Sequence, residues 1–197
     1  MIAAFRCSPV LASVLAAVGT VAACAGPPAQ TGPNAPTDQL QTLVDVATAR
    51  VVLSDQVSAA KFGTPSPIDD PAREHQELTE VADSAQRDGV EPVEATRFFS
   101  DQIAASKVVQ RGLYQRWTAH PEQRPGAHPN LTTQVRPELD RITTQLLDQL
   151  RATIPIRHAG AGCRAALASA SANAGGPLDQ LHRDALSTAL RSVCGSP

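Results

Sequence analysis

The chain has 197 residues and a formal net charge of −2, from 17 Lys and Arg against 19 Asp and Glu. This near-neutral balance offers no basic field to attract phosphates, so it disfavours nucleic acid as a partner. Beyond an atypical N-terminal stretch, about 160 residues remain, which suffices for one domain with a single core.

The first 25 residues are typical of an export signal. A single positive charge precedes residues 10–25, an apolar run rich in Ala, Val and Leu that is short for a membrane span and ends in small residues. Residues 21–24 (VAAC) resemble a bacterial lipobox, which would make Cys24 a lipidated first residue and a membrane tether. Ordinary cleavage near residues 23–25 is the alternative. Both readings predict an exported protein, either secreted or held in the periplasm or cell envelope.

Residues 26–36 (GPPAQTGPNAP) are uncharged and rich in Pro and Gly, so they predict a linker. The folded domain is therefore expected over residues 37–197. Its periodic segments all have the helical period, with no strand-like alternation of useful length. Start and stop signals place helices from Thr37 or Asp38 to about Phe62, from Asp69 or Asp70 and Pro71 to about Arg87 before Gly89, from Glu91 and Pro92 to about Trp117, from Asn130 or Thr132 to Ile154 and Pro155, around 163–174, and from Pro177 onward. The pattern predicts an all-α, single-domain bundle of about six helices.

Two cysteines fall within this domain, Cys163 and Cys194, 31 residues apart. Neither has a Cys or His nearby at zinc-ligand spacing. In an oxidising compartment we expect a disulfide that links the C-terminal helices and stabilises the fold by roughly 3–4 kcal/mol. The five histidines also lack ligand spacing, so no metal site is predicted.

Several polar residues interrupt apolar stripes. Arg50 and Lys61 share the stripe of the first helix, three turns and about 16 Å apart. Ser106 and Gln110 lie one turn apart on the stripe of the third helix. Each has an ordinary structural explanation when taken alone, because a long cation can reach water and a serine can bond to its own helix.

Further polar residues lie at the starts of two other helices. Asp70, Arg73 and Glu74 have i, i+3 and i+4 spacing and can meet on one face, although Asp70 also suits an N-cap. Arg136 lies in the first turn of the fourth helix. Four cations, counting Arg50 and Lys61, then face inward with too few inward carboxylates to neutralise them. Such a set predicts binding of a small di-anion.

Three segments carry a family resemblance. They are LVDVATARVVLSDQVSAAKF (43–62), PIDDPAREHQEL (67–78) and FFSDQIAASKVVQ (98–110). The spacing of Arg, Lys, Arg, Ser and Gln along them resembles that of the all-helical chorismate mutases of the AroQ type, over nearly the whole of residues 37–195. The export signal, the added segment 130–147 and the cysteine pair resemble the secreted gamma subclass.

The resemblance implies a chorismate mutase type II fold that converts chorismate into prephenate without a cofactor, usually as a homodimer. It implies these roles: Arg50, Arg73 and Arg136 hold the two substrate carboxylates, Lys61 and Gln110 donate to the ether oxygen, Ser106 contacts a carboxylate, and Asp70 and Glu74 address the ring hydroxyl. Lys61, Gln110 and Arg73 form the catalytic set. Arg136 takes the place that another subunit's arginine occupies in the intracellular dimers.

The chain also departs from the secreted members, which tend to place Thr and Glu where this sequence has Ser106 and Gln110. An amide donates a hydrogen bond at any ordinary pH, whereas a carboxyl group must first be protonated. Glu77 rivals Glu74 for the ring hydroxyl. The alternative function is a non-catalytic exported helical module that binds a small di-acid.

Overall fold

The computed structural model describes residues 36–195, and in that range it contains helices and their connections without a strand. The α-helices are α1 (Pro36–Lys61), α2 (Pro71–Asp88), α3 (Pro92–Ala119), α4 (Arg136–Ala152), α5 (Ile154–Arg157), α6 (Ala161–Gly175) and α7 (Gln180–Ala189). A 3-10 turn (Pro121–Gln123) and a π-helical turn (Leu131–Val135) lie between α3 and α4. The predicted all-α class is confirmed. The export signal, Cys24 and most of the linker lie outside the described residues.

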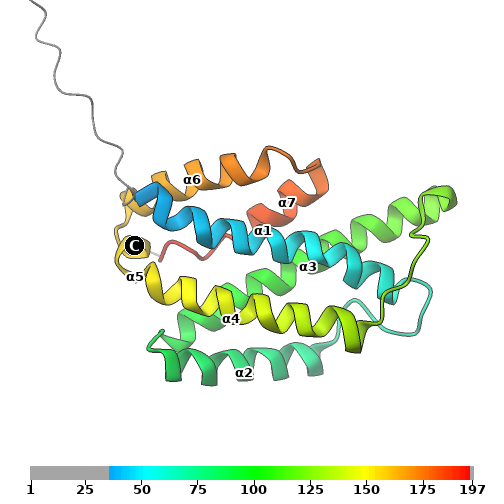
Figure 1. The fold of residues 1–197 in the computed structure, drawn as a ribbon, viewed down its shortest axis with the longest axis horizontal. Helices are drawn as coiled ribbons and strands as arrows, with labels where there is room; N and C mark the ends of the chain where they lie inside the picture. The colour runs from blue at the N-terminus through cyan, green and yellow to red at the C-terminus, as the bar shows by residue number, and fades with distance from the viewer. Residues whose placement is uncertain (1–35, 196–197) are drawn as a thin grey trace, which may run out of the picture. The chain divides into compact units, whose positions relative to one another are not determined.

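The long helices α1, α3 and α4 form the middle of the bundle. In Figure 1, α2 runs along one side of them and α6 with α7 along the other. Helix α2 packs on α3 and α4, α6 packs on α1, and α7 packs on α3. The core between them is apolar, with Phe98 and Phe99 in edge-to-face contact at 5.6 Å.

Helix α2 begins and ends where the sequence predicts. The Asp70 carboxylate accepts the Arg73 backbone N–H at 3.1 Å, and Pro71 occupies the first turn. Gly89 ends the helix with φ of +72°, a left-handed conformation that glycine adopts without steric cost. These two residues set where α2 begins and ends.

The fourth predicted helix is divided in the structure. Asn130 accepts the backbone N–H groups of Thr132 and Thr133, both at 2.9 Å, and opens the π-helical turn before α4. Pro137 explains the wider turn, because its ring would clash with the carbonyl four residues earlier in a regular α-helix. At the other end α4 stops at Ala152, and α5 follows as a separate turn that contains Pro155. The prediction of a single helix from Asn130 or Thr132 to Ile154 and Pro155 was therefore wrong.

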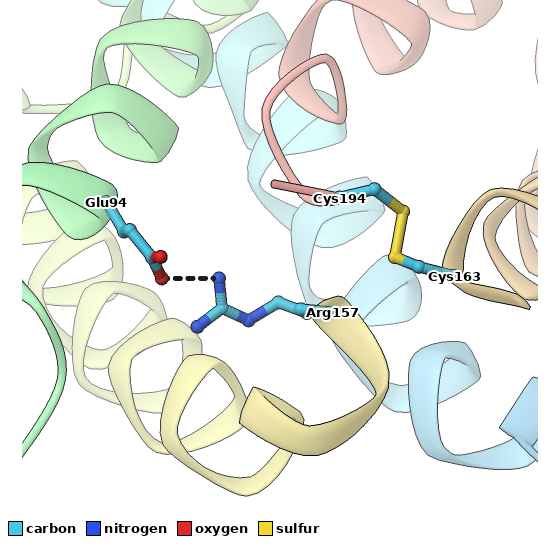
Figure 2. The surroundings of a disulfide bond; sticks show 4 residues. All are labelled: Glu94, Arg157, Cys163 and Cys194. Carbon is cyan, nitrogen blue, oxygen red and sulfur yellow. Dashed lines mark hydrogen bonds and ion pairs between the residues drawn. A yellow bond between two sulfur atoms is a disulfide. The ribbon is translucent and has the colours of Figure 1, made fainter. Parts of the chain in front are cut away.

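The C-terminal part is joined covalently, as expected. Cys163 on α6 forms a disulfide with Cys194, which follows α7 (Figure 2). Nearby, the buried guanidinium of Arg157 pairs with Glu94 at the start of α3, at 3.2 Å. Helix α7 begins at Gln180 rather than at Pro177, because Asp179 caps it through the His182 N–H at 2.9 Å. Across residues 36–195, no helix combines the length and apolar character needed to cross a bilayer.

Candidate active site

A cavity of about 410 Å³ opens among α1, α2, α3, the loop before α2 and the start of α4. Its volume lies within the range of roughly 300–1,000 Å³ that small-molecule sites occupy. All eight residues predicted to bind substrate line it: Arg50, Lys61, Asp70, Arg73, Glu74, Ser106, Gln110 and Arg136. The structure therefore brings together residues that the sequence spreads over 87 positions.

Arg50 is almost fully buried, and it is paired. Its Nη2 lies 2.6 Å from Glu77 Oε1 on α2, and its Nη1 donates to Thr143 Oγ1 on α4 at 3.3 Å. The guanidinium carbon also lies 5.9 Å from the centroid of the Phe99 ring. The prediction of an unpaired cation at this position was wrong, because the partner comes from a different helix. Arg50 Nε has no partner in the described part of the chain.

Lys61 lies at the end of α1, where its Nζ donates to the Pro67 carbonyl at 2.7 Å. Burial lowers the pKa of Lys61; Asp70 and Glu74 oppose this shift, and the positive charge of Arg136 adds to it. The ammonium therefore lies in the field of Arg136 as well as of three carboxylates, the third being Asp69. A lysine with two hydrogens left beyond its contact to Pro67 can still donate to a ligand.

Glu74 is held from two sides. Its Oε1 accepts the Asp70 backbone N–H at 3.0 Å, and its Oε2 accepts from Lys107 Nζ at 2.7 Å. Lys107 lies on α3, lines the cavity and was missed by the sequence reasoning. A signal was present, because Lys107 is four residues after Ile103 and three before Gln110, both on the inward stripe of α3.

Ser106 and Gln110 form a polar strip on α3 that faces α1. Ser54 Oγ donates to Ser106 Oγ at 3.0 Å. The Gln110 side-chain amide donates to the carbonyl and hydroxyl of Ser106 at 3.3 and 3.2 Å. Gln110 is only 3 % exposed, and its Oε1 has no partner within residues 36–195. The unmet atom is an acceptor, so donation to a ligand requires the Gln110 amide to exchange one of its long contacts to Ser106.

The charges of the cavity are more balanced than predicted. Five cations line it: Arg50, Lys61, Arg73, Lys107 and Arg136. Five carboxylates do so as well: Asp70, Glu74, Glu77, Glu80 and Asp140. The expectation of too few inward carboxylates was therefore wrong. Two of the cations, Arg50 and Lys107, pair with carboxylates, whereas Arg73 and Arg136 make no ion pair within the described residues.

The arrangement suits recognition of a small anion. Two free guanidiniums can each hold a carboxylate through two parallel hydrogen bonds. The ammonium of Lys61 and the amide of Gln110 add further hydrogen-bond donors. Over the described residues, no group of three or more His, Cys, Asp or Glu side chains is placed to hold a metal ion.

Comparison with known proteins gives one consistent result. Residues 41–111, which span most of α1 through α3, match the family Chorismate mutase type II. The chain is 31 % identical to a secreted chorismate mutase of Mycobacterium tuberculosis, over 80 % of this chain and 79 % of that one. It is 32 % identical to a secreted chorismate mutase of Mycolicibacterium smegmatis, over 79 % and 86 %.

Solved structures agree with the sequence relatives. A chorismate mutase from Burkholderia phymatum is similar with a TM-score of 0.78 and 31 % identity, over 82 % of this chain and 99 % of that one. One from Burkholderia thailandensis is similar with a TM-score of 0.75 and 41 % identity, over 79 % and 99 %.

Proposed function

The chain belongs to the chorismate mutase type II family, and from that premise we propose that the cavity binds chorismate and catalyses its rearrangement to prephenate. The enzyme is an exported isomerase. One observation carries the assignment of the site: cations and amide donors spaced along the sequence as in the family all line a single cavity of suitable size.

The reaction is a unimolecular pericyclic rearrangement that requires no nucleophile. What it requires is a compact substrate conformer and donors directed at the ether oxygen, where negative charge develops as the C–O bond breaks. Arg73 and Arg136, both free of ion pairs in the described chain, are the main carboxylate ligands. Lys61 and Gln110 donate to the ether oxygen, and removal of one such donor costs about 10²–10³ in rate.

We assign the remaining roles from the family resemblance. Arg50 is a carboxylate ligand that substrate must share with Glu77. Ser106 contacts a carboxylate, and Glu74 with the backbone of Asp70 addresses the ring hydroxyl. Glu74 is favoured over Glu77 for that role because it bonds to the Asp70 backbone N–H and its charge acts on Lys61, whereas the partner of Glu77 is the buried Arg50.

We also propose how the chain is divided and processed. Residues 1–25 are the export signal, 26–36 the linker and 37–197 the catalytic domain, in the manner of the secreted gamma subclass. Cys24 is either a lipid anchor in the cell envelope or a residue lost near ordinary cleavage. The mass of the mature N-terminus distinguishes these outcomes. We also propose a homodimer, to be checked by light scattering of the purified domain.

Loss of chorismate absorbance on addition of the purified domain tests the activity. Lys61→Ala and Arg73→Ala should each lose at least about 100-fold in turnover while retaining the helical spectrum. Arg97→Ala is the matched control, since Arg97 is an exposed α3 arginine that does not line the cavity, and it should match the wild type. Binding of chorismate without turnover by the wild type would instead identify a non-catalytic di-acid-binding module.

A further inference from the structure

Lys107 joins three elements at the edge of the cavity. Its Nζ lies 2.7 Å from Glu74 Oε2 on α2 and 3.1 Å from Asp69 Oδ1 in the loop before α2. The lysine itself belongs to α3, and its side chain is only 18 % exposed. Together with the Asp70 N–H on Oε1, this ammonium leaves neither oxygen of Glu74 without a donor.

We propose that Lys107 is a positioning residue of the chorismate site, which fixes the Glu74 carboxylate toward the ring hydroxyl and neutralises its charge so that a di-anion can enter. The inference rests on the proposed function. Lys107 itself does not touch the substrate in this arrangement; it acts through Glu74.

The geometry supports the orienting role. A glutamate has three rotatable side-chain bonds, and one donor alone would leave the carboxylate free to turn. Two donors from different elements, Asp70 N–H and Lys107 Nζ, restrict it to one orientation. A carboxylate has about four lone-pair sites, so two remain for a hydroxyl donor from the substrate. Orientation fixed before binding reduces the entropy lost when the substrate is held.

The charge of Lys107 supports the second role. An uncompensated carboxylate within the cavity would repel a substrate with two carboxylates of its own. Burial lowers the pKa of Lys107, but the hydrogen bonds to Glu74 and Asp69 outweigh it and leave that pKa raised. The lysine therefore remains positively charged over the working pH range, and the Glu74–Lys107 pair is neutral overall.

Asp69 has an independent support, which makes Lys107 a clean target for substitution. Arg111 holds both oxygens of Asp69, at 2.8 and 2.7 Å, from the outer side of the loop, and Arg111 does not line the cavity. Without Lys107 the loop residue Asp69 keeps these two bonds. The main loss then falls on Glu74, which keeps only the Asp70 N–H.

The test compares KM and kcat for chorismate in wild type, Lys107→Met, Lys107→Arg, Glu74→Gln and the Lys107→Met/Glu74→Gln double variant. Lys107→Met should raise KM about tenfold, equivalent to about 1.4 kcal/mol of lost substrate binding. Its kcat should change less than threefold, because a contact made equally before and in the transition state affects mainly KM. Lys107→Arg should recover most of the loss by keeping the charge.

The double variant carries the decisive comparison. With Gln at position 74 there is no charge to neutralise, so Lys107→Met should then change KM less than twofold. Arg111→Met, the matched control, removes a cation from the same helix, one that also binds Asp69, and should leave KM unchanged within twofold. The role of Lys107 would be overturned by an equal rise in KM from Lys107→Met with Glu or with Gln at position 74. An unchanged KM in Lys107→Met, or no recovery of KM in Lys107→Arg, would overturn it too. Absence of turnover in the wild type would overturn the proposed function instead.

Discussion

Glu77 holds Arg50 by a short ion pair, so substitution of this glutamate should affect stability and substrate binding in opposite directions. The Arg50 side chain is 6 % exposed and that of Glu77 is 27 % exposed. Removal of one partner from a fully buried pair costs about 3–5 kcal/mol. Glu77 is partly hydrated, and Glu77→Gln keeps a neutral carbonyl acceptor for Arg50 worth about 1 kcal/mol. The expected loss of unfolding free energy is therefore about 2 kcal/mol, or about 6 °C in Tm.

The same substitution should improve substrate binding. In the wild type a substrate carboxylate must compete with Glu77 for the Arg50 guanidinium. Relief from that competition should lower KM for chorismate about fivefold, equivalent to about 1 kcal/mol from one charge-assisted hydrogen bond. Urea unfolding gives the first quantity, and initial rates of chorismate loss give the second.

Glu80→Gln serves as the control, because Glu80 lines the same cavity but bonds to Gln76 and makes no ion pair within the described residues. It removes the same charge without affecting Arg50, and the Glu80 carboxylate is exposed, so that water and salt screen its repulsion of the substrate. Stability should therefore change by less than about 0.5 kcal/mol and KM by less than twofold. If Glu77→Gln loses stability as expected yet KM stays unchanged or rises, Glu77 does not compete with the substrate for Arg50. In that case the substrate either does not reach Arg50 or requires Glu77 itself.

Three further predictions follow from the described contacts. Wild-type turnover should vary little between about pH 5 and 8. The Gln110→Glu variant should be active only at acidic pH, since only a protonated carboxyl can donate to the ether oxygen. A pH-independent turnover in the variant would contradict the role of Gln110. Replacement of both Cys163 and Cys194 by Ala should reduce the urea-unfolding free energy by roughly 3–4 kcal/mol with turnover at 25 °C retained, because the disulfide lies outside the cavity; an equal loss of turnover at that temperature would argue against this separation. Burial lowers the pKa of His182, but hydrogen bonds to Asp179 and Asp55 outweigh it and leave that pKa raised. The protonated His182 therefore stabilises the folded state fully below the unfolded-state pKa of about 6.5, and this contribution is lost as the pH rises through the folded-state pKa. His182→Gln should therefore destabilise more at about pH 6 than at about pH 9 in urea unfolding, and a cost that grows with pH would reverse the sign.

Much of the fold and of the site follows from local rules. The helical period alone places Arg50 and Lys61 on one face of α1, because that face is fixed by the geometry of one helix. The start of α2 follows from Asp70 and Pro71 in the same local way. Residues on separate stripes then meet because each stripe must turn toward the common core.

The contacts between helices could not be predicted in this way. The partner of Arg50 is Glu77, which lies 27 residues away on α2. Which side chains meet there depends on how α1 and α2 each pack on α3 and α4, and sequence periodicity does not determine that packing. Lys107 was missed for a related reason: it lies at the margin of the α3 stripe, where inward and outward positions are separated only by packing.

Within the described residues, the side chains that line the cavity come from α1, α2, α3 and α4, the π-helical turn before α4 and the loop before α2. An exported enzyme is often far more dilute than an enzyme inside a cell. When catalytic residues are shared between subunits, activity per molecule declines once dilution separates the pair. Because the proposed site takes both Arg50 and Arg136 from one chain, it does not need a second subunit to supply either arginine.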